Sequence, residues 1–156
     1  MNSDFKELLA VFNEFGVKYL VIGGYAVIKY GNPRFTGDLD LWIEASIENG
    51  SKVYNALLKF GGPVTSLAPS DFSTPGFFFQ MGTPPNRVDI LMSISGADFP
   101  SSYSRKEYVT LEGAGAVPFI SLLDLLATKK AAGRKKDLLD LEILEQIAAT
   151  RTTDKK

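Results

Sequence analysis

Apolar residues recur along the chain at two spacings, which together predict a mixture of helices and strands. Over Ser3–Phe15 they lie three and four positions apart, with Ser3 as the N-cap and Gly16 as the stop, which predicts an amphipathic helix. The apolar run Val17–Ile22 is short, which favours a buried strand. Further helices are expected over Tyr25–Tyr30 and Ile47–Phe60, after the cap Ser121 and from Arg134 onward. Further strands are expected over Leu39–Ile43, Gly76–Met81, Arg87–Ile94 and Arg105–Leu111, and Val117–Ile120 is expected to be a short extended approach to the helix after Ser121.

This order of elements predicts a single α+β domain with a mixed, mostly antiparallel sheet, helices on one face and further helices at the C-terminus. The chain has 156 residues, enough for one domain with its own core. We place the domain at residues 1–149 and expect the polar residues 150–156 to form a tail. Pro63–Thr74 is rich in serine and proline and is expected to be a loop.

Two acidic residues interrupt the apolar pattern soon after a pair of glycines. Gly23 and Gly24 follow the first predicted strand directly, where the chain can turn sharply or approach a ligand closely. On the next strand, the period-two alternation places Asp38, Asp40 and Trp42 on one face and apolar residues on the other. The two carboxylates would lie roughly 7 Å apart and repel each other, which raises a pKa. A divalent metal ion would resolve that conflict.

A third carboxylate, Asp89, lies in the middle of the apolar strand predicted over Arg87–Ile94. A charge buried in such a strand is costly unless it is paired or bound to a metal ion. Two interpretations follow. Asp89 is a third metal ligand beside Asp38 and Asp40, or it forms a salt bridge with Arg87 or another cation.

The composition limits the kind of metal site and the compartment. The sequence contains no cysteine and no histidine, which excludes disulfides and thiolate sites and leaves oxygen ligands, favouring Mg²⁺ or Mn²⁺. The formal net charge of −1 gives no overall attraction to nucleic acid or membrane, so any polyanion site must be local. No apolar run reaches membrane-spanning length and the acidic N-terminus is unlike a signal peptide, so we expect a cytoplasmic protein.

Basic residues near the C-terminus allow two interpretations. Lys129 continues the apolar stripe of the helix after Ser121, so its side chain either extends out to solvent or reaches a polar cavity. The run Arg134–Lys136 is a solvated surface, or it holds a triphosphate or a polynucleotide backbone. Asp137 and Asp140 follow in the first turn of the last helix, where acidic residues suit the helix dipole.

The motifs resemble those of the nucleotidyltransferase superfamily that includes DNA polymerase beta. The resemblance is carried by Gly23-Gly24, then Arg34-Phe35-Thr36-Gly37-Asp38-Leu39-Asp40-Leu41, with Asp89 on a later strand, and it covers roughly Val17 to Leu144. The order and spacing of these motif residues are most similar to those of small bacterial toxin-type nucleotidyltransferases of abortive-infection systems. It implies a polymerase-beta-like fold and a component of a toxin–antitoxin or phage-defence system.

The resemblance also implies roles for particular residues. Asp38, Asp40 and Asp89 would hold two Mg²⁺ or Mn²⁺ ions, with Asp89 as the best candidate for the general base. The triphosphate of the NTP substrate would be held by backbone and side-chain groups of Gly23, Gly24, Arg34, Thr36 and Lys129. Thr36 could equally brace the turn that contains it.

The implied reaction is transfer of an NMP group from an NTP to an acceptor hydroxyl. The sequence does not identify the acceptor, which could be tRNA or another RNA, a protein or a small molecule. The extra helical domain common in antibiotic-modifying and polymerase members has no counterpart here, so a partner protein or a second subunit could supply the acceptor surface. The alternatives are a non-catalytic nucleotide-binding or interaction module and, less well matched to three carboxylates, a structural domain.

Overall fold

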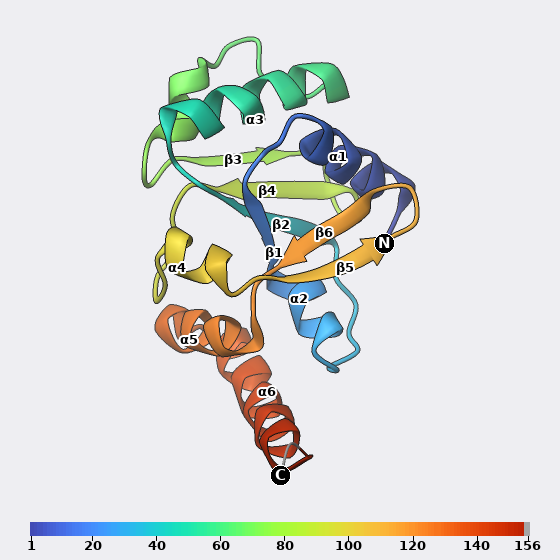
Figure 1. Cartoon of the computed structure of the whole chain (residues 1–156), viewed down its shortest axis with the longest axis vertical. Coiled ribbons are helices and arrows are strands. Elements are labelled where there is room, and N and C mark those ends of the chain that lie inside the picture. Colours follow the sequence, from blue (N-terminus) through green and yellow to red (C-terminus); the bar gives the residue numbers. More distant parts are fainter. Residues whose placement is uncertain (155–156) are drawn as a thin grey trace.

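The computed structural model describes residues 1–154, which form one mixed sheet of six strands with helices around it (Figure 1). The strands are β1 (Tyr19–Ile22), β2 (Asp38–Ile43), β3 (Phe78–Met81), β4 (Arg87–Leu91), β5 (Glu107–Leu111) and β6 (Gly115–Phe119). The helices are α1 (Ser3–Glu14), α2 (Gly23–Lys29), α3 (Ile47–Phe60), α4 (Phe99–Ser104), α5 (Leu122–Ala132) and α6 (Lys135–Asp154), with a 3₁₀ helix, η1, at Pro69–Ser73. The α+β class expected from the sequence is confirmed.

The strand order is β3-β4-β2-β1-β6-β5, and the sheet is mixed, as expected. The central strand β1 is antiparallel to β2 and parallel to β6, and β2 is parallel to β4. The outer strands β3 and β5 are each antiparallel to their neighbours. The two strands that carry the acidic residues, β2 and β4, therefore lie side by side and run in the same direction.

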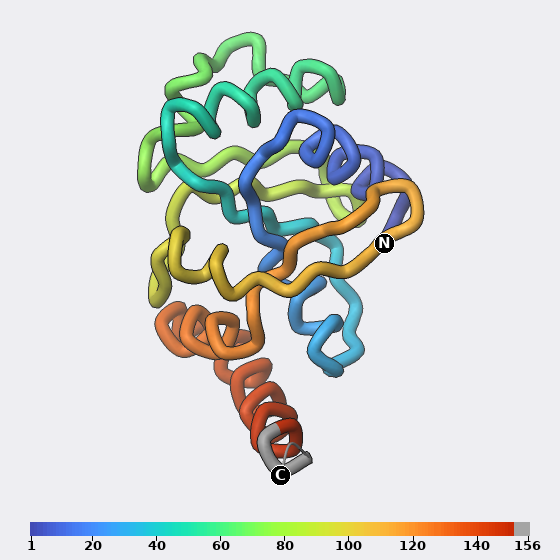
Figure 2. Tube along the Cα trace, in the orientation of Figure 1, coloured from blue at the N-terminus to red at the C-terminus, as the bar shows by residue number. Residues whose placement is uncertain are grey.

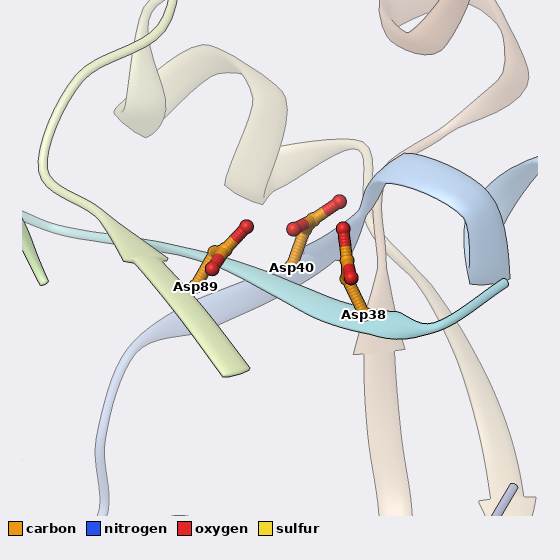
Figure 3. Close-up of side chains that lie close together, drawn as sticks. All are labelled: Asp38, Asp40 and Asp89. Atoms are coloured by element: carbon orange, nitrogen blue, oxygen red, sulfur yellow. The ribbon is translucent and has the colours of Figure 1, made fainter. Parts of the chain in front are cut away.

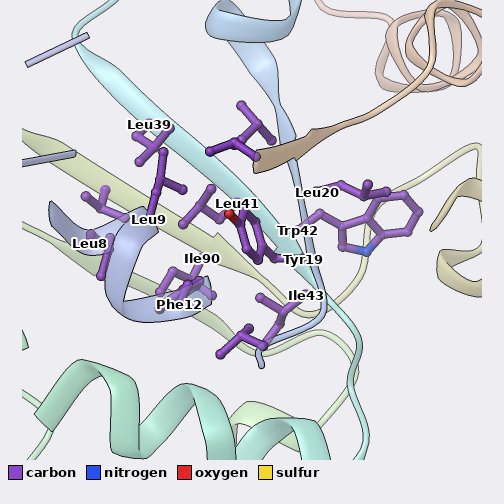
Figure 4. Packing of buried hydrophobic residues seen from close by; sticks show 14 of the residues in the cluster. Leu8, Leu9, Phe12, Tyr19, Leu20, Leu39, Leu41, Trp42, Ile43 and Ile90 are labelled. Carbon is purple, nitrogen blue, oxygen red and sulfur yellow. The ribbon is translucent and has the colours of Figure 1, made fainter. Parts of the chain in front are cut away.

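The apolar face of β2 forms the centre of the core. Leu39, Leu41 and Ile43 are fully buried, as the period-two alternation predicts, and α1 contributes Leu9 and Phe12 to the same cluster (Figure 4). Each fully buried side chain of this size contributes about 1.5–3 kcal/mol through removal of apolar surface from water. This packing fixes the direction in which the alternate residues of β2 point.

The expectation that helices lie on one face of the sheet is wrong. Trp42, which alternates onto the face that carries Asp40, packs edge-on against Phe99 of α4, with ring centroids 5.2 Å apart. Helix α5 covers the same face farther along, where Leu125 and Lys129 line a cavity. The acidic face is therefore partly covered by helices and not open to solvent along its whole length.

Several element boundaries differ from those expected. Helix α1 is capped by Asn2, whose side chain accepts a hydrogen bond from the backbone N–H of Phe5, instead of by Ser3. Residues 150–154, expected in a polar tail, continue α6, which extends away from the sheet (Figure 2); the rest of that expected tail, 155–156, lies outside the described residues. The expected loop at 63–74 contains η1, where Phe72 is buried.

Helix α4 was not expected from the sequence, although Asp98 is its N-cap and Pro100 lies in its first turn. Both are local signals that favour the start of a helix. Within the described part of the chain, no helix combines the length and the apolar character needed to cross a membrane.

Candidate metal centre

Three carboxylates meet on the acidic face of the sheet. Asp40 on β2 is directly opposite Asp89 on the parallel strand β4, and Asp38 lies two residues before Asp40 on the same face. One carboxylate oxygen from each residue lies within 4.8 Å of the other two (Figure 3). The convergence of Asp38, Asp40 and Asp89 expected from the sequence is therefore present.

Burial and the neighbouring carboxylates both disfavour the ionised form of Asp40. Burial, together with the charges of Asp89 and Asp38, raises the pKa of Asp40 to about 7, and the positive charge of Lys136 only partly opposes this. This is the repulsion that the spacing of the acidic residues predicts. A divalent cation among the three groups would relieve it.

Arg87 partly neutralises the cluster. Its Nη2 atom donates to Asp38 at 2.6 Å and to Asp89 at 3.1 Å, so the salt bridge considered for Asp89 as an alternative to metal binding is present. Gln80 on β3 donates its amide N–H to the other oxygen of Asp89 at 2.9 Å. One guanidinium among three carboxylates leaves an excess of negative charge, and the oxygen-only donor set fits Mg²⁺ or Mn²⁺.

The cluster forms one wall of a cavity of about 460 Å³, a volume within the range of small-molecule sites. Arg134 and Lys136, which belong to the basic run noted in the sequence, also line this cavity. Both lie close enough to Asp40 for their charges to interact electrostatically with that carboxylate. The cavity therefore offers a metal-binding wall and cationic groups that suit a phosphate chain.

Of the eight site residues predicted from the sequence, five line the cavity: Gly23, Asp38, Asp40, Asp89 and Lys129. The other three, Gly24, Arg34 and Thr36, are not among the residues that line it. The hydroxyl of Thr36 donates to the backbone carbonyl of Asp38 at 3.1 Å, so Thr36 braces the turn before β2, which was one of its two expected roles.

Lys129 reaches the polar cavity that was one of its two expected destinations, but its ammonium group is already paired. Its side chain is buried, and Nζ lies 3.2 Å from an oxygen of Asp137 and 3.2 Å from an oxygen of Asp140. Arg134 also pairs with Asp137, and Arg34 pairs with Asp140. Lys129 and Arg34 therefore pair with aspartates in the first two turns of α6, where both were expected to bind phosphate.

Two residues that line the cavity, Gln80 and Phe78, were not expected there from the sequence. Gln80 and Phe78 alternate onto the face of β3 that borders the cavity, and Phe78 is half-exposed there. The period-two pattern of β3 could have revealed this face, but three consecutive phenylalanines hide the pattern. Arg87, treated only as a salt-bridge partner, also lines the cavity.

Comparison with protein-family models gives no match, and comparison with curated proteins gives none either. The functional assignment therefore depends on the site.

Proposed function

We propose that this protein is a metal-dependent nucleotidyltransferase that moves an NMP group from an NTP to an acceptor hydroxyl. The observation that supports this most directly is the cluster of Asp38, Asp40 and Asp89, with carboxylate oxygens within 4.8 Å of one another, at the wall of a cavity that also holds Arg134 and Lys136. Acidic groups that hold metal ions and cations that hold phosphates are the two requirements of phosphoryl chemistry.

The three carboxylates would hold two Mg²⁺ or Mn²⁺ ions, which supply charge neutralisation at the attacking and leaving oxygens of an in-line displacement. Gly23 lines the cavity beside Asp40, and its missing side chain leaves the room that the Asp40 carboxylate occupies. Arg134 and Lys136 would contact the β- and γ-phosphates through charge-assisted hydrogen bonds.

In this reaction the acceptor oxygen forms a bond to the α-phosphorus, the bond from that phosphorus to the bridging oxygen breaks, and pyrophosphate leaves. The acceptor proton passes to Asp89, which accepts hydrogen bonds from Gln80 and Arg87 in the free protein. Each oxygen of Asp89 accepts one of these hydrogen bonds and keeps a second lone pair, so the carboxylate can still accept the proton. The acceptor, whether an RNA, a protein or a small molecule, would approach from the side of the cavity that the NTP does not fill.

A second candidate function is a nucleotide-binding or interaction module without catalysis. The contact of Arg87 with both Asp38 and Asp89 favours it, because a guanidinium that stays in place would occupy the position of a metal ion. The two functions differ in their response to metal. Mn²⁺ should raise the melting temperature of a metal-binding protein by mass action, and should leave that of a permanently ion-paired cluster unchanged.

The decisive experiment compares two positions of the radioactive label. The protein is incubated with Mn²⁺, a cell lysate and each NTP labelled either at the α- or at the γ-phosphate. Species that are also labelled in lysate without the protein are disregarded. NMP transfer then predicts an additional labelled acceptor, from the α-phosphate only, that does not form with an Asp38→Asn/Asp40→Asn variant. Label from the γ-phosphate would instead indicate a kinase, and absence of label from every NTP would favour the non-catalytic module.

A further inference from the structure

On the acidic face of the sheet, a row of polar residues is followed directly by a row of apolar residues. The pairing of β3, β4 and β2 places Gln80, Asp89 and Asp40 in one row across three strands. Two residues farther along, the next row on this face contains Phe78 and Leu91. The step between the rows is about 7 Å, so an apolar shelf lies directly beside the acidic cluster.

Phe78 is unusually placed for a phenylalanine. It lies on the edge strand β3, lines the cavity and remains 50% exposed. Leu91 lies opposite it, and Ile94 and Leu125 also line the cavity. An exposed aromatic ring at the wall of a cavity, with apolar neighbours, is a surface suited to a flat ligand group.

We infer that Phe78 and Leu91 form the shelf on which the base of the NTP stacks, an inference that rests on the proposed function. Arg134 and Lys136 line the cavity together with the acidic cluster, so this charged part of the cavity is where we place the phosphate chain. The base then extends in the opposite direction. A ribose separates the α-phosphate from the base by a distance close to the step between the two rows.

Stacking of this kind gives affinity without selecting one base, because every base presents a π-face. We therefore expect the four NTPs to depend on Phe78 to a similar degree.

The test is a comparison of NTP with inorganic tripolyphosphate, which has the phosphates but neither sugar nor base. Binding of each to the full chain is measured by calorimetry in the presence of Mn²⁺. Phe78→Ala should weaken the binding of all four NTPs roughly ten- to hundredfold and leave tripolyphosphate binding unchanged. Tyr108→Ala is the matched control, because Tyr108 is an exposed aromatic on the other edge strand, β5, and should change neither.

A second variant distinguishes loss of the stacking contact from a folding defect. Phe78→Trp should retain NTP affinity, and its new indole, unlike the buried Trp42, should be quenched by NTP but not by tripolyphosphate. Unchanged NTP affinity in Phe78→Ala, with tight binding by the wild type, would overturn the shelf and leave the proposed function intact. Failure of the wild type to bind any NTP would overturn both.

Discussion

The carboxylate of Asp40 occupies the space in which a side chain at Gly23 would begin. A Cβ atom built on Gly23 would lie 2.0 Å from Oδ2 of Asp40, far inside contact distance, and Gly23 has a φ of 68°. Only glycine satisfies both conditions, because it lacks the Cβ and adopts positive φ readily. The glycine in the turn after β1 is therefore required for the observed position of the Asp40 carboxylate on β2.

Gly23→Ala should displace Asp40 and abolish the Mn²⁺-induced rise in melting temperature. The variant should also lose about 1–2 kcal/mol of unfolding free energy, the cost of a left-handed conformation with a Cβ. Gly16→Ala is the matched control, because Gly16 has a φ of 67° but nothing within 4 Å of its added Cβ. It should lose stability similarly and keep the full Mn²⁺ response. Loss of the response in both variants would mean that Gly23 acts only through backbone strain.

Asp40→Asn and Asp38→Asn should both weaken Mn²⁺ binding, but they should affect the metal-free protein differently. Asp40 is crowded by two other carboxylates, so its neutralisation should leave the unfolding free energy unchanged or higher at pH 8, above its pKa of about 7. Asp38→Asn instead loses a partly exposed ion pair with Arg87 and should cost up to about 1 kcal/mol. Urea unfolding with EDTA measures this difference, and equal losses would indicate that the repulsion at Asp40 is relieved without a metal ion.

The acidic cluster could be predicted from the sequence because the information is local. Alternation on β2 fixes the face of Asp38 and Asp40, and an acidic residue within an apolar strand marks Asp89. A guess that the strands with Asp40 and Asp89 are neighbours is then enough to bring the three carboxylates together. The strand pairing itself came from the resemblance and not from the periodicity.

The partners of the basic residues could not be predicted in the same way. Arg34 and Asp140 are 106 residues apart, and their contact depends on where the C-terminal helices dock. Sequence periodicity shows which side of a helix Lys129 occupies, but not which acidic groups meet it there. The extent of α6 was also missed, because its C-terminal residues are polar and their helical state continues from the preceding turns.

Lys129→Met is expected to destabilise the fold. Its ammonium lies between Asp137 and Asp140, and removal of one partner from a buried ion cluster costs about 3–5 kcal/mol. Because Arg134 and Arg34 still pair with the two aspartates, we expect a smaller loss of about 2–4 kcal/mol.

Chemical denaturation measures that loss, with Lys130→Met as the control. Lys130 is the exposed neighbour of Lys129, and its replacement should change the stability by less than about 0.5 kcal/mol. If Lys129→Met instead has near-wild-type stability and binds NTP more weakly, the ammonium group of Lys129 binds the nucleotide.

A separate ion pair fixes the start of α5, the helix that covers the cavity. Arg105 donates two hydrogen bonds, of 2.9 and 2.8 Å, to the two oxygens of Asp124, and the hydroxyl of Ser121 donates a third of 2.9 Å. Burial opposes ionisation of Asp124, but these hydrogen bonds outweigh it and hold its pKa below the ordinary value. The charged form of Asp124 therefore stabilises the folded state.

Asp124→Asn should lower the unfolding free energy by about 1–2 kcal/mol at pH 7, a modest value because Arg105 is half-exposed. A carboxyl with a lowered pKa in the folded state contributes its full stabilisation above its unfolded pKa of about 3.9, and loses it as the pH falls through the folded value. The gap between the wild type and Asp124→Asn should therefore narrow at lower pH, as urea titrations between pH 7 and pH 2.5 would measure. Asp4→Asn, a change at an exposed carboxylate on α1, should alter stability by less than about 0.5 kcal/mol throughout. A gap for Asp124→Asn that stays constant with pH would mean that its hydrogen bonds do not depend on its charge.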